Sequence, residues 1–250
     1  MNAKPYLQEV SLERKQISKH SSYPFNIPGV RGLRSLSFHP DVTFIVGENG
    51  CGKSTILEGI AIAWGFNPEG GTINFRFTTR SSHSNLYKHL RLVKSFRRPK
   101  DGFFLRAESF FNLATNIEDM DAEPAHAPLV IGSYGGHSLH EQSHGESFLA
   151  LLLHRFGGNG LYILDEPEAA LSPTRQLSVL RRIHDLVLKK SQFIIATHSP
   201  ILMAYPNAKI LLLDKTGFKE VSYQETDHYV VAKEFMNDPT RIIKRLLAEE

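Results

Sequence analysis

The stretch that decides the fold is residues 41–55, which read Asp-Val-Thr-Phe-Ile-Val-Gly-Glu-Asn-Gly-Cys-Gly-Lys-Ser-Thr. Residues 41–46 are mostly apolar and β-branched, which is typical of a buried strand. A glycine-rich turn follows. The next apolar residues recur at the spacing of one helix face and predict a helix over 53–64: Ile56, Leu57, Ile60 and Trp64. This order puts the turn at the carboxyl end of a buried strand.

The turn itself fits the phosphate-binding pattern G-x-x-x-x-G-K-[ST] as Gly47-Glu48-Asn49-Gly50-Cys51-Gly52-Lys53-Ser54. Its glycines let successive backbone N–H groups point at one anion, and the helix start adds partial positive charge. We expect Lys53 to reach the β- and γ-phosphates of a nucleotide, Ser54 to bind Mg²⁺ and Thr55 to contact the α-phosphate. A chance match is the alternative, and the strand–turn–helix context disfavours it.

Composition excludes several classes of protein. The 250 residues are 41% hydrophobic, too apolar for a wholly disordered chain, and the single cysteine, Cys51, excludes a disulfide scaffold. No apolar run approaches the roughly 18 residues of a membrane span. Residues 1–15 are charged and lack the apolar core of an export signal, so we expect a cytoplasmic location. The net charge of +3 is too small to name a partner.

Apolar patterning along the rest of the chain predicts alternating strands and helices. Strands are expected at 6–13, as an edge strand, and at 33–38, 161–164, 192–196 and 209–213. Helices are expected at 146–156, at 173–190 with Ser172 as N-cap, and over most of 228–248 with a break near Pro239. Residues 66–142 are less regular. The alternation favours a parallel sheet covered by helices.

A second chemical motif is Leu161-Tyr162-Ile163-Leu164-Asp165-Glu166, in which two carboxylates follow four apolar residues. A buried strand ending in acids places them at the carboxyl edge of the sheet, where ligands bind in open α/β folds. Asp165 can hold Mg²⁺ through water, and Glu166 can polarise an attacking water. The alternative is an Asp-Glu pair in a surface turn before Pro167, which the nearby phosphate-binding pattern disfavours.

A third motif, Ser143-His144-Gly145-Glu146-Ser147, precedes an apolar helix. Ser143 and Glu146 make a capping box, and a glycine in the first turn leaves the backbone open to a phosphate. The positive end of a helix favours such an anion. An ordinary helix start is the alternative for this segment taken alone.

Together these motifs resemble the ABC-type ATPases. The shared order is the P-loop, Ser-x-Gly-Glu, apolar-Asp-Glu-Pro, Ala170-Leu171-Ser172 and Thr197-His198-Ser199. The resemblance is greatest to the small soluble members of the AAA family that group with the SMC, RecF and RecN proteins, and it covers 47–55 and 143–199. It implies an α/β fold of the P-loop NTPase class, with a mostly parallel sheet flanked by helices and an antiparallel N-terminal β portion.

The resemblance further implies one domain over 1–250. Residues 1–65 and 157–250 would form the nucleotide-binding core, and residues 66–156 a smaller lobe with the signature motif. It implies hydrolysis of ATP to ADP and phosphate with Mg²⁺ on Ser54 and Asp165, and catalytic roles for Glu166, His198 and Lys53.

Members of this group work as head-to-tail dimers. By that resemblance, Ser143, Gly145 and Glu146 would bind the ATP held by the P-loop of the other subunit. Ala170-Leu171-Ser172 would cross the dimer seam, and His198 would contact the γ-phosphate.

The sequence departs from the family in three places. The signature reads Ser-His-Gly-Glu rather than Ser-Gly-Gly-Gln. The glutamine expected between P-loop and signature is missing, because Gln142 is too close to the signature, and Glu108 is a candidate substitute. No clear adenine-stacking aromatic is present; Tyr23 and Phe25 are candidates, with core packing as the alternative for both.

A basic segment runs from Arg76 to Arg106, with nine Lys or Arg and one acid, Asp101. Such a concentration predicts contact with nucleic-acid phosphates; a solvated face or a surface for an acidic protein are the alternatives.

The sequence as a whole leaves three candidate functions. The first is an ATP-driven switch acting on DNA or RNA in repair, maintenance or defence. The second is an ATPase subunit of a transporter, and the third is a regulatory ATPase paired with a separate effector protein.

Overall fold

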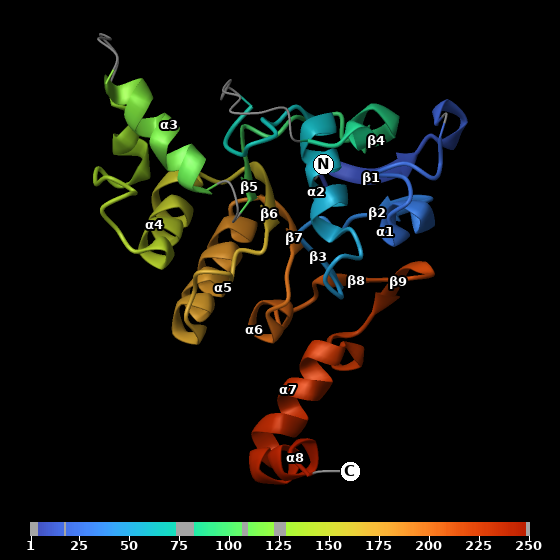
Figure 1. The fold of residues 1–250 in the computed structure, drawn as a ribbon. Helices are drawn as coiled ribbons and strands as arrows, with labels where there is room; N and C mark the ends of the chain where they lie inside the picture. Colours follow the sequence, from blue (N-terminus) through green and yellow to red (C-terminus); the bar gives the residue numbers. More distant parts are fainter. Residues whose placement is uncertain (1–4, 18, 74–82, 107–109, 123–128, 249–250) are drawn as a thin grey trace.

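A six-stranded sheet forms the centre of the protein (Figure 1), and its strand order is β5-β6-β7-β3-β8-β9. The computed structural model describes residues 5–17, 19–73, 83–106, 110–122 and 129–248. Neighbouring strands run parallel except for the β8–β9 hairpin. The strands are β3 (Val42–Gly47), β5 (Asp101–Arg106), β6 (Gly160–Asp165), β7 (Gln192–Ala196), β8 (Lys209–Asp214) and β9 (Gly217–Val221). The mostly parallel α/β fold is therefore confirmed.

A smaller antiparallel sheet lies beside the first, with the order β2-β1-β4. Its strands are β1 (Leu7–Leu12), β2 (Ser35–Ser37) and β4 (Leu90–Lys94). The prediction of an edge strand at the N-terminus is wrong, because β4, which the sequence did not reveal, pairs with the free side of β1. The antiparallel N-terminal β portion is confirmed.

Helices cover both faces of the central sheet, and Figure 1 shows α2 and α5 on opposite sides. The α-helices are α1 (Pro28–Gly32), α2 (Lys53–Trp64), α3 (Phe110–Ala122), α4 (His144–Ala150), α5 (Pro173–Leu188), α6 (Pro200–Met203), α7 (Asp227–Asn237) and α8 (Pro239–Leu246). Single turns of 3₁₀-helix occupy Arg14–Gln16, Asn85–His89, Val130–Tyr134 and Tyr223–Glu225, and a π-helical turn, Leu151–Arg155, continues α4.

Alternation along the buried strands divides the interior into two cores. In β3, Phe44 belongs to the core shared with α5, whereas its neighbour Ile45 belongs to the core shared with α2. The same alternation separates Phe193 from Ile194 in β7. A continuous apolar run therefore serves both faces of the sheet, as expected for a strand covered on both sides.

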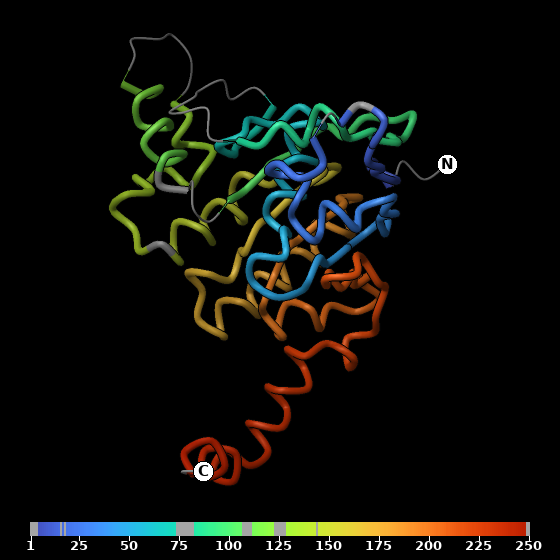
Figure 2. Tube along the Cα trace, turned by 45° about the vertical axis from the view of Figure 1, so that its right-hand side comes forward, coloured from blue at the N-terminus to red at the C-terminus, as the bar shows by residue number. Residues whose placement is uncertain are grey.

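Several predicted boundaries agree with the structure. Helix α2 spans 53–64 as predicted, Ser172 caps α5 by accepting a hydrogen bond from the Arg175 N–H, and the C-terminal helical region breaks at Pro239. The predicted helix over 146–156 begins two residues earlier, at His144, and its end, Leu151–Arg155, is π-helical rather than α-helical. Helices α7 and α8 extend away from the body as an arm (Figures 1 and 2).

The less regular region 66–142 contributes to both sheets. Strand β5 forms one edge of the central sheet by pairing with β6, and β4 pairs with β1. No apolar–polar alternation marks β5 in the sequence, because its Phe103-Phe104-Leu105 run is buried on both faces. The range 66–156, expected to form a smaller lobe, thus supplies a strand to the sheet that carries the candidate site.

Candidate nucleotide-binding site

The phosphate-binding loop lies between the carboxyl end of β3 and the first turn of α2. Lys53 is buried, and its Nζ donates hydrogen bonds to the carbonyl oxygens of Gly47 at 2.9 Å and Glu48 at 3.0 Å. Gly47 has φ +148°, and a Cβ there would lie 2.3 Å from the Leu213 carbonyl oxygen. The loop can therefore curl only with glycine at this position, and it places an ammonium group inside the curl.

Ser54 and Asp165 meet at the edge of the sheet, where β6 ends beside the loop. The Ser54 hydroxyl donates a 3.1 Å hydrogen bond to Asp165 Oδ1, and the Asp165 side chain is largely buried. A hydroxyl and a carboxylate are hard oxygen donors, the kind that Mg²⁺ takes together with water and phosphate oxygens. The pair therefore fits a magnesium ion.

Glu166 follows directly and adopts a left-handed backbone, with φ +50°. Its N–H donates to the Ala196 carbonyl oxygen at 2.9 Å, and its Oε1 lies 3.7 Å from His198 Nε2. Left-handed geometry at a residue other than glycine is uncommon and occurs preferentially at functional sites. The Glu166 carboxylate thereby lies beside His198.

His198 follows β7 and is held on two sides. Its backbone N–H donates to Glu168 Oε1 at 2.6 Å, and its Nδ1 lies 3.1 Å from Nε2 of His228, in the first turn of α7. Among the described residues, its Nε2 has no hydrogen-bond partner. Burial lowers the pKa of His198, and the Lys53 charge lowers it further against the opposing effect of Glu166.

Two site residues were missed by the sequence analysis. Glu168 extends the acidic run after β6, and burial raises the pKa of its carboxyl despite the hydrogen bond from His198. The sequence could have indicated Glu168, because it is the third acid of the run Asp-Glu-Pro-Glu at residues 165–168. His228 had no such signal, because only the folding of α7 against the end of β7 brings it to His198.

A cavity of about 1210 Å³ lies beside the P-loop and the two histidines. Residues 47–51, His198 and His228 line it, and so do apolar residues of α7: Val231, Ala232, Phe235 and Met236. The remaining walls come from Pro28, Pro200, Asp227 and residues 212–216. Within the described part of the chain, no residue of the signature segment 143–147 lines this cavity.

The signature segment forms the start of α4 and makes the predicted capping box. Glu146 Oε2 accepts hydrogen bonds from the Ser143 N–H at 3.1 Å and the Ser143 hydroxyl at 2.6 Å, and Arg175 donates to Glu146 Oε1 at 3.0 Å. Hydrogen bonds from Ser143 and Arg175 lower the pKa of the Glu146 carboxyl. A Cβ on Gly145 would lie 2.6 Å from the Ala170 carbonyl oxygen, so glycine allows α4 to pack against the segment 170–172.

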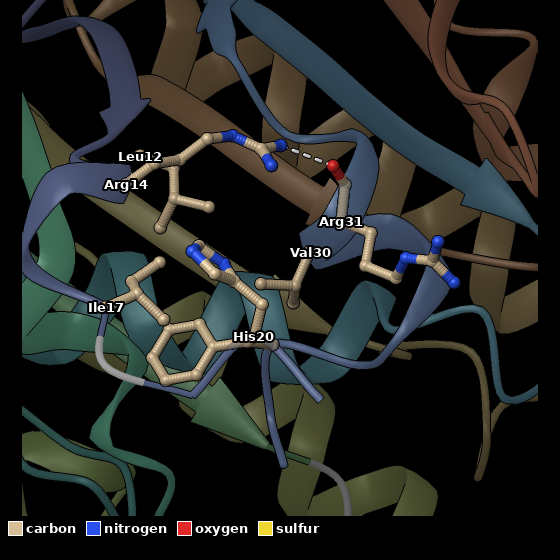
Figure 3. A pocket seen from close by; sticks show the side chains of 7 residues that line it. Leu12, Arg14, Ile17, His20, Val30 and Arg31 are labelled. Atoms are coloured by element: carbon tan, nitrogen blue, oxygen red, sulfur yellow. Dashed lines mark hydrogen bonds between the residues drawn. The ribbon is translucent and has the colours of Figure 1, made fainter. Parts of the chain in front are cut away.

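The aromatic candidates for adenine lie apart from the P-loop cavity. Tyr23 is 60% exposed, whereas Phe25 is buried and packs edge-on against His89 with 5.0 Å between ring centroids. Phe25 lines a separate hollow of about 420 Å³ in which the Arg14 guanidinium donates to the Arg31 carbonyl oxygen (Figure 3). Glu108, the candidate for the missing glutamine, lies outside the described residues.

The basic segment is partly accounted for by internal contacts. Arg106 is bound to Glu58 at 2.7 Å, and Lys94 lies 4.4 Å above the Trp64 ring. Partial burial of its ammonium group lowers the pKa of Lys94, and the charge of Arg98 adds to this effect. Six of the described cations are exposed: Lys88, Arg91, Lys94, Arg97, Arg98 and Lys100. Arg76 and Arg80 lie outside the described residues.

No helix in the ranges that the structure describes is both long and apolar enough to cross a bilayer.

Comparison with known families identifies two matching segments. Residues 25–103 match the family model "AAA domain", and residues 129–204 match the model "AAA domain, putative AbiEii toxin, Type IV TA system". The first match contains the P-loop, and the second contains the signature segment, Asp165, Glu166 and His198.

The chain is also similar to curated and solved proteins. It is 28% identical over 190 residues to an "Uncharacterized ABC transporter ATP-binding protein" of Haemophilus influenzae, covering 70% of this chain and 71% of that protein. It is 27% identical over 175 residues to "ABC transporter G family member STR2" of Medicago truncatula, covering 64% of this chain and 24% of that protein. A solved SMC head bound to the C-terminal winged-helix domain of ScpA has a TM-score of 0.48 at 14% identity, covering 87% of this chain and 98% of that one.

The AAA-domain matches contain the motifs that the fold assembles at one sheet edge. The chain is therefore a P-loop ATPase that is similar to AAA-domain proteins and to ABC-type ATP-binding proteins.

Proposed function

We propose that the chain binds ATP with Mg²⁺ and hydrolyses it to ADP and phosphate within a head-to-tail homodimer. The observation that carries the proposal is the division of the motifs within one chain. The P-loop, Asp165, Glu166 and His198 gather at one sheet edge, whereas the described lining of the cavity there includes no signature residue. A second copy can supply Ser143, Gly145 and Glu146 to complete the pocket.

Each group at the sheet edge has a role in this reaction. Lys53 and the loop amides bind the β- and γ-phosphates, exchanging the contacts of Lys53 with Gly47 and Glu48 for contacts with the anion. Bound Mg²⁺ would be held by Ser54 and Asp165 and would neutralise charge on the phosphate oxygens. Glu166 orients the attacking water, and His198 Nε2 donates to the γ-phosphate. Catalysis then consists mainly of positioning and charge neutralisation.

Hydrolysis and release of phosphate remove the anion that the two subunits share. The signature of one copy then loses its ligand on the other, and the dimer opens. ATP state is thereby coupled to the distance between subunits, as in other switches ordered by a γ-phosphate.

Mixing two inactive variants tests the shared site. Lys53→Ala removes the P-loop cation from one copy, and Ser143→Arg blocks the signature of the other. We expect each variant alone to lose ATPase activity and a mixture to recover part of it. In a mixed dimer one site is damaged twice, and the other combines an intact P-loop with an intact signature.

The control is Leu177→Arg, which alters an exposed side chain of α5 outside the proposed site. This variant is expected to retain the activity of the wild type, which would show that an arginine introduced elsewhere on the surface does not abolish hydrolysis. Full activity of the Ser143→Arg variant alone, or a mixture no more active than its parts, would contradict the shared site. Absence of ATP binding by the wild-type chain would contradict the nucleotide assignment itself.

We propose that the switch acts on nucleic acid through its basic segment. Support comes from six exposed cations, which lie at the end of the 3₁₀ turn 85–89, on β4 and in the β4–β5 connection. The salt dependence of DNA or RNA binding tests this partner.

Two alternatives remain open for the biological role. The names of the two curated relatives support an ATPase subunit of a transporter. A regulatory ATPase with a separate effector protein is the other. Stimulation of the ATPase rate by DNA or RNA, but not by lipid vesicles, would favour the nucleic-acid switch over both.

A further inference from the structure

The His198–His228 contact joins the end of β7 to the helical arm. Their rings lie 5.3 Å apart between centroids and are tilted by 54°, with His198 Nδ1 and His228 Nε2 3.1 Å apart. Both histidines line the cavity together with the P-loop. The contact therefore lies beside the place where a γ-phosphate would bind, and the second histidine comes from a different element of the fold.

The position of His228 is fixed by the start of α7. Thr226 is fully buried, and its hydroxyl accepts a hydrogen bond from the Tyr229 N–H and donates one to the Tyr223 carbonyl oxygen. The Tyr223 hydroxyl in turn donates to the carbonyl oxygen of Pro200 at 2.9 Å. Since α6 begins two residues after His198, both histidines are anchored to the same short segment.

The surroundings of both imidazoles favour the neutral form. Burial lowers the pKa of His198 and of His228, and Lys53 adds to the effect at each. Nearby carboxylates oppose this shift without reversing it, Glu166 at His198 and Asp227 and Glu168 at His228. Two neutral rings sharing one hydrogen bond have two arrangements, since each ring carries one proton. Either His228 donates to His198 Nδ1, or His198 donates to His228 Nε2.

The surrounding charges select between these arrangements. His198 Nε2 lies 3.7 Å from the Glu166 carboxylate and has no hydrogen-bond partner among the described residues. If His198 donated through Nδ1, its Nε2 would present a lone pair to a carboxylate and to an anionic phosphate. If His228 donates, Nε2 presents an N–H to both. Donation by His228 therefore gives attraction between His198 Nε2 and these anions, whereas donation by His198 gives repulsion.

We propose that His228 is a positioning residue for His198: its Nε2–H donates to His198 Nδ1 and so keeps the proton of His198 on Nε2, where it faces the γ-phosphate. The phosphate contact of His198 belongs to the proposed function, and the consequence for hydrolysis rests on it. The hydrogen bond also joins the first turn of the arm to the hydrolytic site, so α7 must be docked for His198 to have the correct tautomer and ring orientation.

Two variants of similar size, His228→Gln and His228→Glu, distinguish hydrogen-bond donation by residue 228 from the packing of its side chain. Glutamine at 228 keeps an amide N–H donor, whereas glutamate removes the donor and leaves an acceptor. Long-range ¹H–¹⁵N correlation spectra of the nucleotide-free protein at pH 8 report which nitrogen of His198 carries the proton. We expect the proton on Nε2 in wild type and in His228→Gln, and on Nδ1 in His228→Glu.

ATPase kinetics supply the second measurement. We expect kcat to fall by about 10- to 100-fold in His228→Glu and in His228→Ala, with partial recovery in His228→Gln. Affinity for ATP, measured separately, distinguishes a lost tautomer from simple repulsion of the nucleotide by the new carboxylate. The matched control is His184, whose Nδ1 lies 3.1 Å from the Tyr205 hydroxyl on another part of the chain. His184→Gln and His184→Glu are expected to leave kcat unchanged.

A proton on Nδ1 of His198 in the wild-type spectrum would overturn the proposal whatever the kinetics. Equal kcat for the wild type and the glutamate variant would also overturn it. The proposed function fails separately, if the wild type hydrolyses no ATP or if His198→Ala hydrolyses it at the normal rate. In that case the spectrum still shows whether His228 or His198 donates the hydrogen bond between them.

Discussion

The Ser54 hydroxyl lies 3.1 Å from Asp165 Oδ1, although 111 residues separate the two in sequence. Ser54 lies in the first turn of α2, which follows β3, and Asp165 ends β6, with β7 between these strands in the sheet. Parallel strands bring their carboxyl ends to one edge, so the sheet order alone brings a hydroxyl and a carboxylate together. The same edge carries Glu166 and His198, which makes it the place to test the proposed chemistry.

Glu166→Gln is expected to keep ATP binding and to lower the hydrolysis rate by about 10²- to 10⁴-fold. The amide keeps the size of the side chain but loses the charge that orients water. With ATP and Mg²⁺ the variant should accumulate as a closed dimer, measured by size-exclusion chromatography with light scattering. Glu220→Gln alters an exposed carboxylate on β9 and serves as the control. Hydrolysis at the normal rate by Glu166→Gln would remove Glu166 from the mechanism.

Gly145→Ala is expected to lower the ATPase rate by about 10²-fold while ATP still binds the P-loop. An added Cβ would lie 2.6 Å from the Ala170 carbonyl oxygen and 2.7 Å from Arg175 Nη1, so the start of α4 must shift. Such a shift moves the proposed signature without touching Lys53. Gly132→Ala is the control, because a Cβ there meets no atom within 4 Å. Unchanged turnover in Gly145→Ala would show that the start of α4 does not contribute.

Asp101→Asn is expected to lower the free energy of unfolding by about 1–3 kcal/mol, measured by urea denaturation. Asp101 begins β5, and its carboxylate accepts hydrogen bonds from the Tyr162 hydroxyl at 2.7 Å, the Gly157 N–H at 3.0 Å and Arg155 at 3.0 Å. An asparagine side chain would point an N–H donor at groups that are themselves donors, so it cannot accept all the hydrogen bonds that the carboxylate accepts. The control, Asp185→Asn, alters an exposed pair with Arg181 and should cost less than about 0.5 kcal/mol. Equal losses in the two variants would contradict this role.

The same carboxylate predicts a pH dependence of stability. Burial raises the pKa of Asp101, but the hydrogen bonds from Gly157 and Tyr162 and the charge of Arg155 outweigh burial and bring it below 3.8. The unfolded state therefore binds the proton more readily. The contribution of Asp101 to the free energy of unfolding is fully present above the pKa that this carboxyl has in the unfolded chain. It is lost as the pH falls through the lower pKa of the folded protein. Below about pH 4, wild-type stability should fall toward that of Asp101→Asn; a constant difference between the two would contradict the assignment.

Binding to duplex DNA should weaken with salt, with a log–log slope of about −5 if the six exposed cations of the basic segment meet phosphates. Replacing Arg97 and Arg98 together with alanine should reduce the slope by about 2. Arg181→Ala, an exposed cation on α5, is the control and should leave the slope unchanged. Binding that does not depend on salt, or no measurable binding, would exclude this surface as a nucleic-acid site. Fluorescence anisotropy over a salt series provides the measurement.

Local sequence alone determined the parts of the site that depend on neighbouring residues. The P-loop lies between β3 and α2 as predicted, because strand, turn and helix are each specified within a few residues by apolar spacing and glycines. The capping box of Ser143 and Glu146 formed for the same reason. The acids after β6 also lie at the predicted sheet edge, since a continuous apolar run is sufficient to indicate a buried strand.

Only the tertiary structure decided which distant residues meet. Strand β5 and the central position of β1 depend on pairing with partners far along the chain, which apolar spacing does not encode. His228 reaches His198 because α7 packs at the end of β7, although neither histidine lies in a pattern that indicates the other. Sheet order and helix docking fix these contacts through burial summed over the whole core, and this sum cannot be read from any single stretch of the sequence.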